Sequence, residues 1–512
     1  VTLRHVEGAL RLDRQLVDLR DRKRTDTDVA VQDAFGGVGA IAANLRKRRI
    51  SATELATATL DRLERSGPAL NALATLTRER ALEEARRADP RLARGGAGPL
   101  VGIPYGAKDL IATARTPGAT LERPAEDPLA QDAPAVARLV RSGAVLAAKL
   151  AVENAGGGWS KLATVHLVGG DGRRVPVVQH GYGRNPWDPR RWSGGSSSGP
   201  AAAVGAGLLP FALGTETSGS VVGPAAFCGL TAVRPTFGLV SLRGVVRLSW
   251  TLDKIGVLAH SADDCALVLS AIAAGDARDP ASRGRRFHPL ARAEASRAVR
   301  RVRLGFAEED FAGSDASARA FAAAFAELRR LVKGVTRVAI PEGDYGAMVN
   351  VVMSAEGCTE YAHLIESERF ESYVMPRQAA ALRAGLGVSA RRYFDVSRSR
   401  DRLRRDFARL FESVDVLVAP AQYTTAPLLE TLEAPRDVRA AAATAGNRGL
   451  TAAGNLAELP AVVVPCGAGE DGMPLGLQLV GPAFSEPLLL ALAAAYQRET
   501  AHHLRRPPAL PG

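Results

Sequence analysis

The amino-acid sequence predicts an α/β layer fold, in which helices pack on both faces of a β-sheet. Short apolar runs alternate with amphipathic helical segments along most of the 512 residues, and this alternation is typical of α/β proteins. Hydrophobic residues make up 46% of the chain, which is enough for a large core. No internal repeat or low-complexity linker divides the sequence, so residues 31–512 are expected to form a single domain.

The first third of the chain carries the clearest element signals. Ser51 and Glu54 match a capping box, and a helix is expected to follow it and to end at Gly67. A second amphipathic helix is expected over 70–94. The apolar, glycine-punctuated run 100–110 predicts a strand and a tight loop. A helix over 133–142 and a strand over 144–148 follow.

Two segments lack a regular hydrophobic period. Residues 1–30 are densely charged and are expected to form an N-terminal arm. Residues 155–192 mix Gly, Arg, Trp and His, and they are expected to form a loop insertion of the kind that often carries function. The elements expected in the second half are a strand at 302–306, a helix at 316–332, a strand at 335–340, helices over 345–413, strands at 415–419, 461–465 and 475–480, and a helix at 485–498.

Charge and cysteine content limit the class of protein. The formal net charge is +12, but only seven of the 66 basic residues are Lys, and the arginines alternate with acids. This pattern favours solvated helix faces over a nucleic-acid groove, so no nucleic-acid partner is expected; the densest basic stretch, 283–303, is where one would bind. The four cysteines have neither metal nor disulfide spacing and are expected to be buried free thiols.

The sequence also predicts where the protein works. No run of about 18 apolar residues occurs, so no membrane span is expected. The N-terminus lacks the apolar core of a secretory signal. A cytoplasmic location is therefore expected.

Two glycine- and serine-rich turns hold the most informative chemistry. Ser196 lies in the first and Ser220, 24 residues later, in the second. A phosphate-binding loop is disfavoured because no G-K-[ST] occurs. Residues 195–199 match the G-x-S-x-G nucleophile elbow with Ser197 at its centre. That motif needs a later acid and histidine, which the sequence does not exclude.

A serine nucleophile needs a base at neutral pH. No histidine lies in or between the two turns, whereas a lysine can serve if burial lowers its pKa. Lys108 ends the apolar run 100–110 and is the candidate. On spacing alone, an ordinary pair between Lys108 and Asp109 at the end of a strand explains this lysine at least as well.

Three ordered motifs make the chain resemble the amidase signature family over about 34–505. They are GIPYGAKDL at 102–110, then GGSSSGPAAAV at 194–204 with LGTETSGSVVGPAAFCGL and VRPTFG over 213–238, and finally NLAELPAVVVPCG with MPLGLQLVGP over 455–482. The resemblance implies an α/β/α sandwich around a large mixed β-sheet.

The resemblance also implies a catalytic triad. Ser220 becomes the nucleophile, Ser196 the bridging serine that follows a cis peptide bond, and Lys108 the base. Backbone N–H groups of Thr217, Ser218, Gly219 and Ser220 would form the oxyanion hole.

Three departures from the family pattern affect the site. Ser218 stands where a glycine is common, and Val222 stands where an arginine is common. The 155–192 insertion lengthens the separation between Lys108 and Ser196, and it is expected to shape the mouth of the site.

The function implied by the resemblance is amide hydrolysis. The chain is expected to cleave linear carbon–nitrogen bonds other than peptide bonds in a small-molecule amide, without a metal or an organic cofactor, and to form a homodimer. The alternative is the glutaminase (A) subunit of a tRNA-dependent amidotransferase, although residues 349–400 look more like stand-alone hydrolases. An esterase centred on Ser197 and a nucleic-acid binder using 283–303 are the remaining alternatives.

Overall fold

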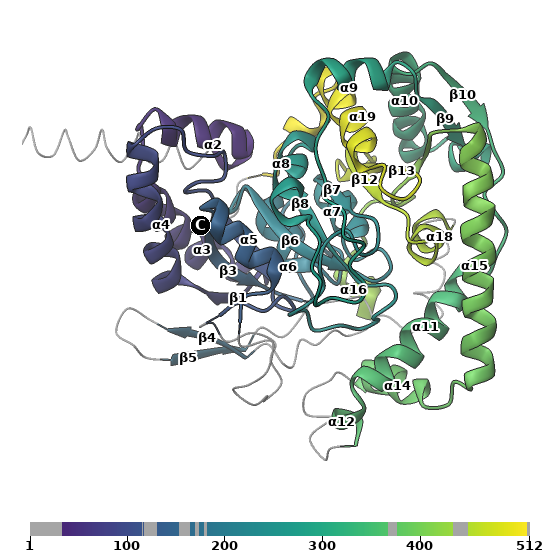
Figure 1. Ribbon diagram of the computed structural model, residues 1–512, viewed down its shortest axis with the longest axis horizontal. Coiled ribbons are helices and arrows are strands. Elements are labelled where there is room, and N and C mark those ends of the chain that lie inside the picture. Colours follow the sequence, from purple (N-terminus) through teal and green to yellow (C-terminus); the bar gives the residue numbers. More distant parts are fainter. Residues whose placement is uncertain are drawn as a thin grey trace, which may run out of the picture.

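The computed structural model describes residues 33–114, 116, 131–152, 164–168, 174–178, 182–366, 376–433 and 449–508. The arm expected over 1–30 lies outside these residues. Within them, eleven strands form one mixed sheet with helices on both sides, as Figure 1 shows. The predicted α/β/α sandwich is therefore confirmed.

The sheet brings together strands from the whole length of the chain. In spatial order they are β1 (Leu73–Leu76), β3 (Val145–Leu150), β2 (Pro104–Lys108), β6 (Phe211–Glu216), β8 (Lys254–Ala259), β7 (Thr231–Arg234), β12 (Ala461–Ala468), β13 (Pro474–Val480), β11 (Val416–Pro420), β9 (Arg303–Phe306) and β10 (Gly334–Arg337). β2 pairs in parallel with β3 and β6, whereas β8 is antiparallel to both β6 and β7. The ends of β2 and β6 consequently lie side by side.

Helices cover the sheet. Those that pack on its strands are α3 (Ala52–Ser66), α4 (Arg78–Ala93), α5 (Pro134–Ser142), α6 (Ser198–Gly205), α7 (Val222–Cys228), α8 (Ala262–Ile272), α10 (Ala316–Leu331) and α19 (Glu486–Glu499), with α2 (Gly37–Arg46) and α9 (Arg292–Val299) outside them. The predicted capping box at Ser51 is present, because Ser51 and Glu54 satisfy each other's backbone N–H groups at the start of α3. The short α6 and α7 follow the two serine-bearing turns and carry no charged residue.

A group of helices stands beside the sheet. It consists of α11 (Tyr345–Glu360), α12 (Ala362–Ile365), α14 (Pro376–Gly385) and the long α15 (Ala390–Ser413). Figure 1 shows α15 along one side of the molecule, with α11 and α14 near its lower end. The small helix α18 (Leu450–Leu456) lies between this group and the sheet, in contact with both α11 and α15.

Two predicted elements differ from the structure. The helix expected over 70–94 begins only at Arg78; the apolar residues before it form β1, which pairs with β3. The insertion expected to be a loop over 155–192 contains an antiparallel hairpin of β4 (Thr164–Val168) and β5 (Arg174–Val178). β-Branched residues dominate both short segments, and the sequence between them is rich in glycine, which favours a hairpin.

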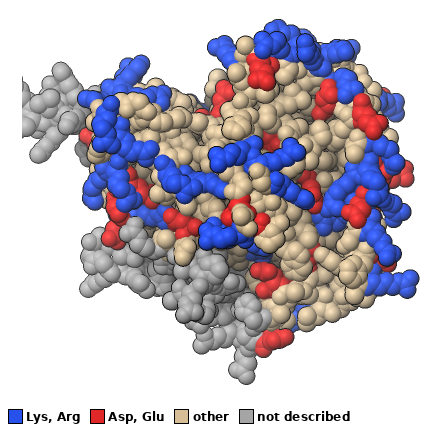
Figure 2. All heavy atoms as spheres, viewed as in Figure 1, with Lys and Arg blue, Asp and Glu red and all other residues tan. Residues whose placement is uncertain are grey.

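Charged residues cover the surface in several places. Figure 2 shows Lys and Arg over much of the visible face, with Asp and Glu between them. Three arginines of the basic stretch 283–303 have partners in the protein: Arg283 pairs with Glu458, Arg303 pairs with Asp415, and Arg285 lies over the ring of Phe484. All four cysteines are free and buried, as predicted. In the described part of the chain, no helix is long and apolar enough to cross a bilayer.

Candidate active site

Lys108 is the last residue of β2, and its side chain is fully buried. Its Nζ atom donates hydrogen bonds to the hydroxyls of Ser196, at 2.7 Å, and Ser197, at 3.1 Å, and to the carbonyl of Thr215, at 3.3 Å. Burial lowers the pKa of Lys108 to about 7, although the negative charges of Asp253 and Glu216 act to raise it. A substantial fraction of an amine with this pKa is neutral at pH 7 and can act as a base.

The first turn carries Ser196 to Lys108. A cis peptide bond joins Gly195 to Ser196, as the resemblance implies. Gly194 has a φ of +86°, and a Cβ atom there would lie 2.6 Å from the Cα of Pro224 in α7. Glycine is therefore required for the first turn to approach the first helical turn of α7 so closely.

The second turn follows β6 and ends at Ser220. The N–H of Ser197 donates to the carbonyl of Ser220, at 3.3 Å, and this bond joins the two turns. Within the described residues, the Ser220 hydroxyl forms no hydrogen bond. The backbone N–H groups of Thr217, Ser218, Gly219 and Ser220 likewise donate to no described residue. All four residues are partly exposed, so the turn offers an accessible hydroxyl and unused backbone donors together.

A buried carboxylate supports this turn from behind. Glu216 is fully buried and accepts the backbone N–H groups of Val221, at 2.8 Å, and Val222, at 2.9 Å. It also accepts Nη1 of Arg234, at 3.0 Å, and Nδ2 of Asn455, at 2.8 Å. Burial acts to raise the pKa of Glu216, but the charge of Arg234 and the hydrogen bond from Asn455 lower it overall. Glu216 therefore stays ionised and fixes the start of α7.

Asp253 supports the same turn from the side. Its carboxylate accepts the hydroxyl of Thr217, at 2.6 Å, and the N–H groups of Leu248, at 2.8 Å, and Ser249, at 3.1 Å. The next residue, Lys254, is also buried, and its Nζ has no hydrogen-bond partner among the described residues. Burial and the charge of the nearby Arg234 lower the pKa of Lys254 to about 7.

The structure settles two alternatives that the sequence left open. Asp109 does not pair with Lys108; it pairs with Lys149 of the neighbouring strand, at 3.2 Å. The hydroxyl of Ser197 is buried between Lys108 and the backbone of Thr215, and no described histidine hydrogen-bonds it. An esterase elbow centred on Ser197 would need an exposed hydroxyl and a histidine, so this arrangement does not fit it.

The two departures from the family pattern near Ser220, at Ser218 in the second turn and Val222 at the start of α7, are accommodated. Ser218 does not have a positive φ; the left-handed position of the turn belongs to Gly219, at +90°. A side chain at Ser218 is therefore compatible with the backbone. Val222 has no polar side chain, but its backbone N–H donates a hydrogen bond to the carboxylate of Glu216.

Sequence reasoning missed the supporting residues Glu216, Arg234, Asp253 and Asn455. The sequence does contain an indication of Glu216 and Arg234, because each is a charged residue at the end of an apolar strand, β6 and β7 respectively. Such a residue must be paired if the strand end is buried. In the described ranges, no group of three or more His, Cys, Asp or Glu is placed to hold a metal ion.

Comparison with known proteins identifies the family. The sequence pattern of the family described as Amidase matches residues 54–490. The A subunit of glutamyl-tRNA(Gln) amidotransferase from Cupriavidus necator is 36% identical, in an alignment that covers 93% of this chain and 98% of that protein. The native peptide amidase of Stenotrophomonas maltophilia is 28% identical with a TM-score of 0.72, and the alignment covers 92% of this chain and 98% of the amidase.

A more distant structure shares the fold alone. The 6-aminohexanoate cyclic dimer hydrolase, complexed with its substrate, is 24% identical with a TM-score of 0.77 over 94% of this chain and all of that one. The family pattern spans well over half of the sequence, and its serine- and lysine-bearing motifs lie together at the ends of β2 and β6. The chain therefore belongs to the amidase signature family and is an amidase-family enzyme.

Proposed function

We propose that the protein hydrolyses a carboxamide with Ser220 as the nucleophile and with Ser196 and Lys108 as its proton relay. The contact between Lys108 and Ser196 supports this proposal most strongly. A fully buried amine with a pKa of about 7 lies 2.7 Å from the Ser196 hydroxyl, and the same turn that holds Ser196 is hydrogen-bonded to Ser220.

The proposed reaction has two stages. The Ser220 hydroxyl attacks the amide carbon, and its proton passes through Ser196 to neutral Lys108. The unused N–H groups of Thr217, Ser218 and Gly219 stabilise the oxyanion. The relay then protonates the leaving nitrogen, so that the C–N bond breaks and an acyl-Ser220 ester remains. A water molecule attacks this ester, and the products are the acid and regenerated serine.

Substitution of the nucleophile tests the proposal. We expect Ser220→Ala to lower amide hydrolysis by at least about 10⁴-fold and to abolish labelling by a fluorophosphonate probe. Lys108→Ala should also remove most of the activity. Ser218→Ala is the matched control, because it changes a hydroxyl of the same turn but leaves every backbone donor in place. Labelling that persists in Ser220→Ala would show that another residue attacks.

The relatives favour the glutaminase role in an amidotransferase over a stand-alone hydrolase. Curated proteins 34–36% identical to this chain over at least 90% of it bear the name of the A subunit of glutamyl-tRNA(Gln) amidotransferase. We therefore propose glutamine as the first substrate to test and place this candidate ahead of the stand-alone hydrolase suggested by residues 349–400. Similarity to a peptide amidase also gives no support for excluding peptide substrates.

An activity comparison separates the two candidates. Glutamine and a panel of primary, aryl and peptide amides would be assayed with the isolated protein and again with the partner subunits of an amidotransferase. Glutaminase activity that requires the partners supports the amidotransferase role. Rapid hydrolysis of another amide by the isolated chain supports the stand-alone enzyme.

A further inference from the structure

A loop of seven residues is hydrogen-bonded both to the helices beside the sheet and to the second serine-bearing turn. We call this turn, residues 217–220, the nucleophile turn. This 247–253 loop precedes β8, and Asp253 at its end holds the hydroxyl of Thr217, at 2.6 Å. Asp253 also holds the loop itself, through the N–H groups of Leu248 and Ser249. Displacement of the loop would therefore displace Thr217, whose backbone N–H is one of the proposed oxyanion donors.

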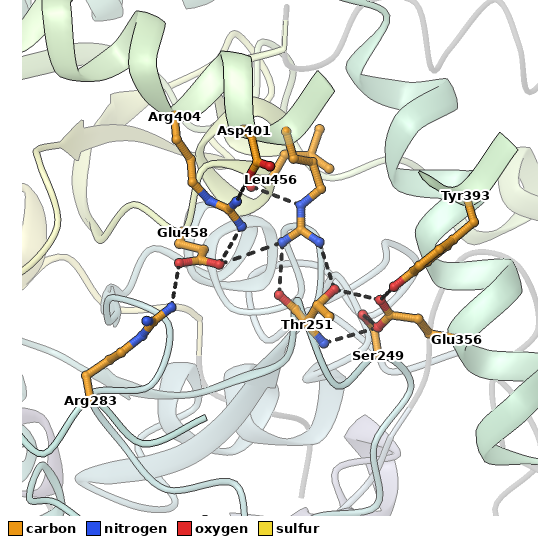
Figure 3. Close-up of polar contacts among 10 residues, drawn as sticks. Ser249, Thr251, Arg283, Glu356, Tyr393, Asp401, Arg404, Leu456 and Glu458 are labelled. Carbon is orange, nitrogen blue, oxygen red and sulfur yellow. Dashed lines mark hydrogen bonds and ion pairs between the residues drawn. The ribbon is translucent and has the colours of Figure 1, made fainter. Parts of the chain in front are cut away.

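Glu356 binds the other side of this loop. It lies on α11, is fully buried, and accepts the hydroxyl of Ser249 and both the N–H and the hydroxyl of Thr251, at 3.1 and 2.7 Å. Its fourth hydrogen bond comes from the hydroxyl of Tyr393 on α15, at 2.7 Å. Figure 3 shows the carboxylate of Glu356 between Tyr393 on one side and Ser249 and Thr251 on the other.

Arg400 of α15 holds the same loop at a second point. Its guanidinium donates to the hydroxyl and the carbonyl of Thr251, at 2.8 and 3.1 Å, and to the carbonyl of Leu456, at 3.2 Å. Glu458 lies on the far side of Arg400, at 3.9 Å, and binds Arg404 and Arg283. Glu458 therefore belongs to the same polar cluster in Figure 3 but does not touch the loop.

We propose that Glu356 is a positioning residue for the nucleophile turn, acting through the 247–253 loop, Asp253 and Thr217. The four hydrogen bonds to its carboxylate come from neutral donors, and three of them come from the loop, so the carboxylate fixes the loop more than it joins the helices. The inference rests on the proposed function, because it assumes that the turn at Ser220 performs the reaction. When an NH2 group replaces one oxygen of a buried carboxylate bound in this way, the hydrogen bonds that this oxygen accepted are lost.

The substitution Glu356→Gln tests this role. An amide nitrogen in place of Oε2 would face the N–H of Thr251, and one in place of Oε1 would remove the acceptor of the hydroxyls of Thr251 and Tyr393, so the loop should shift. We expect kcat to fall by about tenfold to a hundredfold, as small displacements at oxyanion donors do, while KM stays within about twofold because the charge on the oxyanion develops only after binding. Glu458→Gln is the matched control, and it should leave kcat and KM unchanged. Tyr393→Phe is the milder variant if Glu356→Gln does not fold, and a smaller fall in kcat is expected.

A double-mutant cycle tests whether Glu356 acts on the nucleophile turn through the contact between Asp253 and Thr217. Thr217→Val keeps the backbone N–H but removes the hydroxyl that binds Asp253. If Glu356 acts through this contact, Glu356→Gln should lower kcat much less in the Thr217→Val background than in the wild type. An equal fall in both backgrounds would overturn the route, and an unchanged kcat in both Glu356→Gln and Tyr393→Phe would overturn the positioning role.

The experiments distinguish a failure of the proposed function from a failure of the positioning role of Glu356. If Ser220→Ala retains full activity, the assignment of the nucleophile is wrong. If Ser220→Ala is inactive and the Glu356 and Tyr393 variants keep the wild-type kcat, only the positioning role is wrong.

Discussion

At the residue scale, the burial of the Lys108 amine predicts how kcat/KM depends on pH. Its amine is enclosed, and burial lowers its pKa to about 7. The protonated amine cannot accept the serine proton, so we expect kcat/KM to fall as the pH drops through about 7. The nearby charge of Asp253 raises this pKa, so Asp253→Asn should move the acid limb to lower pH, as measured by kcat/KM between pH 5 and 9.

A second buried lysine supplies the control for this pH profile. Lys254 also has a pKa lowered to about 7, by burial and by the charge of Arg234. It is not among the charges that shift the pKa of Lys108. Lys254→Met should therefore keep the acid limb, whereas disappearance of the limb in this variant would assign it to Lys254.

The partner of Lys108 could not be predicted from the local sequence. Asp109 is its neighbour in the chain, but the carboxylate pairs with Lys149. β2 and β3 are parallel neighbours, so Lys149 reaches Asp109 across the sheet. The motifs and the family resemblance nominated Lys108 and Ser196, whose side chains are in contact. They also nominated Ser220, whose carbonyl accepts the N–H of Ser197; its role as the nucleophile stays a prediction. The sequence places a charge at the end of β6, but Arg234 and Asn455, which make Glu216 a supporting carboxylate, come from other segments and needed the tertiary structure.

At the element scale, one glycine sets the shape of the nucleophile turn. Gly219 has a φ of +90°, and a Cβ atom there would lie 3.3 Å from Cγ2 of Thr451 in α18. A residue with a side chain pays about 1–2 kcal/mol in such a conformation. We expect Gly219→Ala to slow fluorophosphonate labelling and lower the melting temperature.

The adjacent Ser218 is the comparison for this variant. Its φ is not positive, so Ser218→Ala should label at close to the wild-type rate and keep the melting temperature. Equal slowing in both variants would contradict the positive φ of Gly219 as the cause.

Short elements were the least predictable part of the fold. β1 has four residues directly before α4, and its apolar pattern continues into the helix, so the sequence suggested one helix over 70–94. Pairing with β3 decides the structure there. Likewise, the hairpin of β4 and β5 is hidden by the surrounding irregular sequence. Long helices and buried strands were predictable because their hydrophobic period extends over many residues.

At the scale of the whole molecule, one buried ion pair and the amide that binds it join the central sheet to a distant helix. Glu216 of β6 and Arg234 of β7 are both fully buried, 3.0 Å apart, and Asn455 of α18 binds the same carboxylate. Loss of one charge would leave the other unpaired. We expect Glu216→Gln to lower the free energy of unfolding by about 3–5 kcal/mol, as measured by urea denaturation.

A partly exposed pair provides the reference for this measurement. Arg303 and Asp415 lie 2.7 Å apart, with 41% and 31% of their side chains exposed. Asp415→Asn should cost about 1 kcal/mol or less, since water screens such pairs. Similar losses in both variants would contradict a special contribution from the Glu216–Arg234 pair.

The pairing of β2 with β6 has a consequence for refolding. Ala107 and Leu213 are partners in this parallel pair, so Lys108 and the nucleophile turn reach each other only after about a hundred intervening residues have been closed into a loop. Contacts of this range form late and slowly in many proteins. A reagent that reacts only with an activated serine would then report the completion of the central sheet, and the recovery of labelling after dilution from urea would time that event separately from helix formation.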